Sequence, residues 1–199
     1  LHKGTSAYSH QKGGGLCFYF SGAFVSGCMI FSNKVDSGVG QSYGHGRTQG
    51  NAQGGGLYSE CGSIVIQNSV IQSNHVRASY AWGDTGTEGA GICLRDGSHL
   101  VRNCLIVKNT SSGARSDYGP FNGDGVYVNA GADVILENCT VADNGQNNPQ
   151  TAQGLWSGAS AVLTNCIVWN HEDDIVSDIA GAVELYYSCI EDGDSAGAI

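Results

Sequence analysis

Six stretches of this chain share one residue pattern, and they recur about 27 to 41 residues apart. Each stretch begins with glycines or a short polar turn, continues through short apolar runs, and carries an Asn-Cys pair or its counterpart. Internal repeats of this length are typical of solenoids, in which each repeat forms one coil and stacking buries a shared core. The stretches span residues 13–33, 54–74, 89–109, 123–144, 153–170 and 182–192.

The repeats align on one column that consists mostly of cysteine. Aliphatic residues occur two positions after this column and apolar residues three positions before it, with polar residues between them. This spacing predicts strands, because side chains alternate between the two faces of a strand, and no helical stripe is present. We place six residues in the column, namely Cys28, Ser69, Cys104, Cys139, Cys166 and Cys189.

Two further columns are rich in asparagine. Asparagine tolerates the left-handed backbone of a sharp corner, so the column directly before the cysteines predicts a corner in each coil. Amide side chains stacked about 4.8 Å apart can form hydrogen-bonded ladders, which we expect in both columns. The corner column holds Asn68, Asn103, Asn138 and Asn165, and the second column holds Asn33, Asn74, Asn109 and Asn144.

The GG-[GA]-[LIV] starts and N-C-x-[IV]-x-x-N ends resemble the repeats of right-handed parallel β-helix proteins of the pectate-lyase-like superfamily. They are similar in particular to the coils of bacterial surface proteins such as chlamydial polymorphic outer membrane proteins. The resemblance implies an all-β, single-stranded, right-handed parallel β-helix of about six coils. We expect one domain over 1–199, with an N-terminal segment at 1–12, coils at 13–192 and a C-terminal tail at 193–199.

Composition narrows the classes of partner and location. The formal net charge is −9 and only 14% of residues are charged, which argues against a nucleic-acid groove and against an anionic membrane surface. No run reaches the roughly 18 apolar residues of a spanning helix. A β-helix rich in Gly, Asn, Ser and Thr with few charges is typical of secreted or displayed proteins. We therefore expect an extracellular or cell-surface location.

Eight cysteines raise the question of disulfides. Neighbours in the cysteine column would lie about 4.8 Å apart, within disulfide range, but a buried Cys also serves as a small apolar residue, and we expect free thiols there. A bridge between Cys17 and Cys61 is an open alternative. The spacings do not fit a CxxC zinc site.

The longest loops, which follow the second asparagine column, should gather on one edge of the rod and form a ledge. Exposed aromatic rings beside polar groups could stack on sugars there, or the aromatic side chains could pack against each other to hold the loops. We therefore expect no cofactor but a possible glycan site. The candidate ledge residues are Tyr43, His45, Arg47, Tyr80, Trp82, Asp84, Tyr118 and Phe121.

Catalytic and metal-binding patterns are weak. Glycosidases of this fold use clustered aspartates, and no such pair faces outward from adjacent coils in our alignment. The tripeptide 44–46 is similar to a polygalacturonase sequence whose partner motifs are absent. The acidic groups 172–174 and 191–194 could bind Ca²⁺, although solvated loops are the simpler interpretation.

The ends of the rod favour self-association. A β-helix without a helical or charged cap presents unpaired backbone groups at each end, and neither terminal segment has the pattern of a cap. Head-to-tail contacts between such ends generate open filaments. The sequence therefore favours a non-enzymatic structural or adhesive protein that can assemble end to end into a filament. The alternatives are a carbohydrate-active enzyme, meaning a lyase or glycosidase, and a sugar-binding module.

Overall fold

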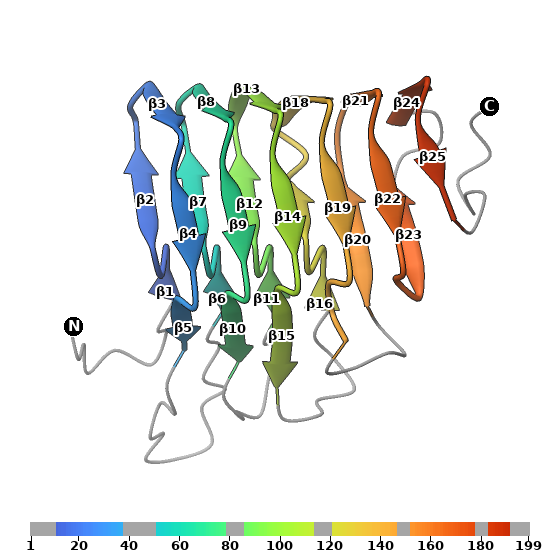
Figure 1. The fold of residues 1–199 in the computed structure, drawn as a ribbon. Helices are drawn as coiled ribbons and strands as arrows, with labels where there is room; N and C mark the ends of the chain where they lie inside the picture. Colours follow the sequence, from blue (N-terminus) through green and yellow to red (C-terminus); the bar gives the residue numbers. More distant parts are fainter. Residues whose placement is uncertain are drawn as a thin grey trace, which may run out of the picture.

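Parallel strands stacked in sheets make up the protein in a computed structural model (Figure 1). The structure describes residues 11–37, 51–78, 86–113, 121–146, 152–177 and 183–191, and these contain strands and no helix. Every strand pairing among them is parallel. No described residue belongs to a helix that could cross a membrane.

Three sheets of six strands run the length of the coil stack, which confirms the expected six coils. Sheet I contains β2 (Leu16–Tyr19), β7 (Leu57–Glu60), β12 (Ile92–Arg95), β17 (Val126–Val128), β20 (Gln153–Ser157) and β23 (Asp173–Ser177). Sheet II contains β3 (Ala23–Ser26), β8 (Ile64–Gln67), β13 (Gly97–Arg102), β18 (Ala132–Glu137), β21 (Ala161–Thr164) and β24 (Val183–Tyr186). Sheet III contains β4 (Met29–Phe31), β9 (Val70–Gln72), β14 (Leu105–Val107), β19 (Thr140–Ala142), β22 (Ile167–Trp169) and β25 (Cys189–Ile190).

Two shorter sheets, which the sequence did not predict, lie beside one end of the three long sheets (Figure 1). A small separate core of Val35, Ala52, Val76 and Ala90 accompanies them. Sheet IV contains β1 (Gln11–Lys12), β6 (Ala52–Gln53), β11 (Thr87–Glu88) and β16 (Phe121–Asn122). Sheet V contains β5 (Lys34–Asp36), β10 (His75–Ala78) and β15 (Thr110–Gly113).

Like residues stack over like residues along the main core. In sheet III the inward position is filled by an aliphatic side chain in every coil, and the register is unbroken. Burying such columns removes apolar surface from water at about 25 cal/mol per Å², which is the main force that holds the coils together. This column contains Ile30, Ile71, Ile106, Val141, Val168 and Ile190.

The last coil corrects our alignment by one residue. Cys166 donates its backbone N–H to Ser188 Oγ at 3.0 Å, so Ser188 occupies the cysteine column, while Cys189 pairs with Ile167 and is exposed. The physical reason is the period of two: placing Cys189 inward would have turned Ile190 to solvent. With Ser188 in the column, Ile190 faces the core instead.

The acidic stretch at 172–174 also differs from the expected solvated loop. Asp173 and Asp174 belong to β23, the first strand of the sixth coil, and Asp174 is fully buried. The next apolar residues, Ile175 and Val176, pair with Leu155 and Trp156 in sheet I. Strand β23 therefore forms because Ile175 and Val176 extend sheet I, and Asp173 and Asp174 belong to the strand because they directly precede them.

Candidate functional site

The predicted ledge lies outside the part of the chain that the structure describes. This holds for Tyr43, His45, Arg47, Tyr80, Trp82, Asp84 and Tyr118. Phe121 begins strand β16, and only its backbone is described. The glycan site on the ledge therefore stays a prediction, and the candidate sites below come from the described coils.

The corner asparagines form an exposed amide ladder. The Nδ2 group of Asn103 donates to Asn68 Oδ1 at 3.1 Å, and Asn138 and Asn165 continue the same pattern at 3.2 Å. All four residues have φ between 50° and 53°, in the left-handed region. Asparagine is therefore needed at these corners for its backbone as well as for its amide.

The second asparagine column forms a buried ladder between sheets III and V. The Oδ1 atoms of Asn74, Asn109 and Asn144 each accept from the Nδ2 and the backbone N–H of the asparagine in the preceding coil, and their Nδ2 groups also donate to carbonyl oxygens inside the stack. These three buried amides are thus satisfied without water, as burial demands. The ladder runs through Asn33, Asn74, Asn109 and Asn144.

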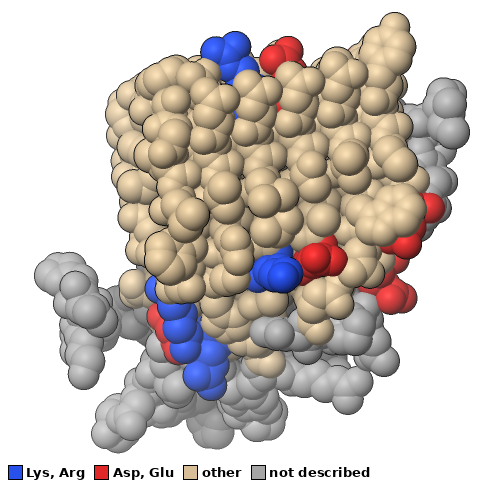
Figure 2. Space-filling view, in the orientation of Figure 1, with Lys and Arg blue, Asp and Glu red and all other residues tan. Residues whose placement is uncertain are grey.

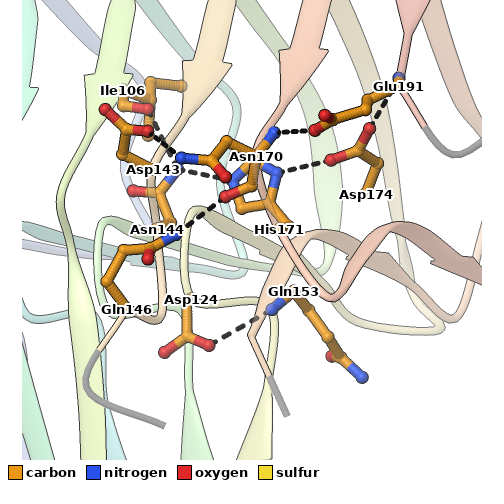
Figure 3. Close-up of polar contacts among 10 residues, drawn as sticks. All are labelled: Ile106, Asp124, Asp143, Asn144, Gln146, Gln153, Asn170, His171, Asp174 and Glu191. Carbon is orange, nitrogen blue, oxygen red and sulfur yellow. Dashed lines mark hydrogen bonds and ion pairs between the residues drawn. The ribbon is translucent and has the colours of Figure 1, made fainter. Parts of the chain in front are cut away.

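A histidine takes the next position in the buried ladder (Figure 3). The Nδ2 group of Asn144 lies 3.2 Å from His171 Nε2, and His171 Nδ1 lies 2.7 Å from Asp174 Oδ1. The second carboxylate oxygen, Asp174 Oδ2, accepts the backbone N–H of Glu191 at 2.8 Å. Because an amide nitrogen can only donate, Nε2 must accept and the ring must carry its proton on Nδ1.

This geometry prevents His171 from acting as a catalytic base. The side chains of His171 and Asp174 are both completely buried, so neither reaches a substrate at the surface. The Nε2 atom, which a general base would need free, accepts from Asn144. Both oxygens of Asp174 are also engaged, which removes it from the Ca²⁺ site considered for 172–174. The pair ends the ladder instead.

The cysteine column is buried through the middle coils. Cys104, Cys139 and Cys166 each donate their thiol to the carbonyl two residues earlier, at 3.2, 3.3 and 3.4 Å. Contacts with the Cys104 and Cys166 thiols, together with burial, raise the pKa of Cys139, so this thiol stays protonated. All eight cysteines are free, including Cys17 and Cys61, whose possible bridge is absent. Cys28, in the first coil, is exposed.

An acidic and sulfur-bearing group lies at the turn between sheets I and II. Glu60, Cys61 and Asp96 bring one ligand atom each within 4.8 Å of one another. The Cys61 thiol lies 3.8 Å from Asp96 Oδ2, and burial with the Asp96 and Glu60 charges raises its pKa. Glu60 also accepts from Lys12 Nζ at 2.8 Å and from Tyr58 at 2.6 Å. Its carboxylate is thus already neutralised inside the protein.

A carboxylate without full hydrogen bonding lies near the ladder end (Figure 3). Asp124 Oδ2 accepts the backbone N–H of Gln153 at 3.3 Å, and Ser111 also bonds this side chain. Asp124 Oδ1 is buried and has no hydrogen-bond partner. Burial raises the pKa of Asp124 because the charged form loses its hydration.

The outward faces of sheets I and III differ. On sheet I the outward row is buried from the second to the fifth coil, and Tyr127 stacks on Trp156 with ring centroids 4.6 Å apart. On sheet III the outward side chains are apolar or uncharged and several are exposed (Figure 2). Along one border of this face lies a shallow depression lined by Lys108, Thr110, Asp143, Gln146 and Asn170.

The residue that our reading of the sequence missed is His171. It follows Cys166 by five positions, as Asn144 follows Cys139, so counting from the cysteine column would have found it. We looked for asparagine at that position and not for another side chain able to accept a hydrogen bond.

Comparisons with known proteins identify the family and no particular relative within it. No curated protein and no solved structure matches the chain. A sequence profile described as "Right handed beta helix region" matches residues 49–198, which is most of the chain. With its stacked parallel sheets, the chain therefore belongs to the family of right-handed parallel β-helix proteins.

Proposed function

We propose that this protein is a non-enzymatic structural or adhesive β-helix of the cell surface or extracellular space, whose coils stack end to end with another copy. The proposal is supported by one observation in particular. Inward side chains of the first described coil pack against the main core but stay only partly buried, so a further coil could cover them. These side chains belong to Leu16, Phe18 and Ala23.

Inward positions at both ends support the same interpretation. Phe18 is only partly buried, whereas Leu94, which occupies the same column two coils further on, is 0% exposed. At the other end Leu185 and Ile190 are likewise only partly buried. Stacking the sixth coil of one copy on the first coil of another would extend the aliphatic columns, because each column already repeats like over like.

The backbone at the first coil is also suited to strand addition. Ala23 and Gly27 donate their N–H groups to the second coil. In a parallel strand alternate residues bond to opposite neighbours, so the N–H groups of Phe24 and Ser26 point away from the second coil. Among the described residues no strand pairs with β3 on that side. Such an edge is a template for another chain.

A proline at this edge tests the proposal. Ser26→Pro removes an outward N–H while leaving the backbone bonds to the second coil in place. Both Ser26→Pro and Ser26→Ala lose the bond from Gln67 Nε2 to Ser26 Oγ, so Ser26→Ala is the matched control. Negative-stain microscopy and sedimentation velocity should show end-to-end assemblies for the wild type and Ser26→Ala, and shorter or no assemblies for Ser26→Pro. A wild-type protein that stays monomeric at high concentration would contradict the proposal.

Sugar binding on the loop ledge remains a separate prediction. Its test is glycan-array binding by the wild type and by Trp82→Ala. Binding that Trp82→Ala abolishes would support a sugar-binding module.

A further inference from the structure

The outward face of sheet III carries few charges (Figure 2), and its outward side chains, most of them apolar, form two rows along the stack. No outward side chain within its strands is charged, in contrast to sheet II, where Arg102, Glu137 and Glu184 face outward. The first row contains Met29, Val70, Leu105, Thr140, Ile167 and Cys189. The second contains Phe31, Gln72, Val107, Ala142 and Trp169.

Two opposite charges stand at the centre of one border of this face. Lys108 follows β14 and Asp143 follows β19, the two middle strands of the six. Lys108 is exposed and makes no ion pair with any described residue. Asp143 accepts one bond, from Asn170 Nδ2 at 2.7 Å. Both residues have left-handed backbones, with φ of 57° and 56°, so their positions are equivalent.

We propose that sheet III binds the same face of a second copy around a two-fold axis parallel to the strands and midway between β14 and β19. Such an axis reverses the order of the coils in the second copy, but each residue keeps its position along the strand direction. The third coil of one copy then faces the fourth coil of the other. Lys108 therefore meets Asp143 of the second copy, and Asp143 meets its Lys108. Each contact occurs twice, as in any isologous dimer.

The same operation places larger outward side chains over smaller ones. Leu105 faces Thr140 of the second copy, and Ile167 faces Val70. In the other row Trp169 faces Gln72. Side chains of two stacked sheets interdigitate across about 10 Å, which requires this alternation of size. A net charge of −9 would oppose association elsewhere on the surface, whereas this face adds to it, beyond the balanced pair, only the exposed Glu191, which follows β25 in the last coil.

The size of the face sets the strength of the dimer. Six strands about 4.8 Å apart and three residues about 3.3 Å long give a footprint of roughly 300 Å² per copy. That area is below what stable protein interfaces bury, so the dimer is weak and should populate at roughly 0.1 to 1 mM. This lateral pairing uses a face and not an end, so it does not depend on the end-to-end proposal.

Charge reversal tests the symmetry directly, with Ser26→Pro as the background in which end-to-end assembly is blocked. Lys108→Asp places Asp opposite Asp143 twice, and Asp143→Lys places Lys opposite Lys108 twice. We expect each variant to dimerise about tenfold more weakly in sedimentation equilibrium at low salt. An equimolar mixture of the two variants should recover dimers, because both intermolecular contacts become attractive again. Within each chain of the mixture, positions 108 and 143 still carry like charges. If the substitutions acted only within a chain, mixing the variants would therefore not restore dimers.

The apolar rows have a matched control within the first coil. Phe31→Ser and Phe24→Ser each remove an exposed phenylalanine, from sheet III and sheet II respectively. Phe31→Ser should weaken dimerisation severalfold and Phe24→Ser should leave it unchanged, with circular dichroism showing that both remain folded. Three outcomes would overturn the proposal: a protein that stays monomeric at about 1 mM, a concentration at which weak interfaces form; a mixture of the charge variants that does not recover dimers; or equal effects of Phe31→Ser and Phe24→Ser on dimerisation.

Discussion

The side-chain amide of Asn144 donates to His171 Nε2 at 3.2 Å, and this bond joins the asparagine ladder to the buried carboxylate of Asp174. The ladder thus ends inside the protein on an imidazole and a carboxylate rather than on water (Figure 3). A single ring satisfies a donor on one side and an acceptor on the other. No aliphatic side chain can do both, which makes this position unusually sensitive to substitution.

His171→Ala should destabilise the fold strongly. It leaves the Asn144 amide and the Asp174 carboxylate buried without their partner, which costs about 3 to 5 kcal/mol of unfolding free energy. His171→Asn keeps an acceptor for Asn144 and should lose less. Urea denaturation gives both values. If His171→Ala cost under about 0.5 kcal/mol, as surface changes do, the ladder end would not be a structural element.

The two asparagine ladders should respond differently to glycine. At Asn103, with φ of 52° at an exposed corner, Asn103→Gly relieves backbone strain and should cost a few tenths of a kcal/mol, whereas Asn103→Ala should cost about 1 to 2 kcal/mol. At Asn109 the buried amide is what matters, so Asn109→Gly and Asn109→Ala should both cost about 2 kcal/mol or more. Similar losses for Asn103→Gly and Asn103→Ala in urea denaturation would show that the exposed amides dominate at the corner.

The repeat explains how much could be predicted. Stacked strands and both asparagine ladders follow from spacing, because each coil buries the same positions. The alignment of the sixth coil was wrong because Ser188 and Cys189 both suit the cysteine column. Only the burial of Ile190, two positions after Ser188, decides between them. His171 escaped because the ladder requires an acceptor and not a particular residue. The sheet III face has no sequence signature of its own, since it emerges only when outward positions of separate coils align.

Thiol reactivity tests the corrected register. In the native protein an alkylating reagent should label Cys17, Cys28, Cys61 and Cys189, which are exposed. The buried thiols of Cys93, Cys104, Cys139 and Cys166 should react only after unfolding. Peptide mass spectrometry distinguishes the two sets. Protection of Cys189 would restore the alignment that places it in the inward column, and a sulfur pair that resists alkylation after unfolding without reductant would reveal a disulfide.

Asp124 should make stability depend on pH in the direction opposite to most aspartates. Burial raises its pKa in the folded protein above the ordinary value near 3.9. As pH rises from that value, the unfolded chain releases the proton first, so the folded state holds more protons and the unfolding free energy falls until the raised pKa is passed. Asp124→Asn removes this loss while keeping an acceptor for the Gln153 N–H. It should therefore be more stable than the wild type at pH 7 and equally stable near pH 3, which urea denaturation at both pH values would measure. A wild-type protein that gains stability relative to Asp124→Asn between pH 4 and 7 would mean that Asp124 is stabilised as an anion.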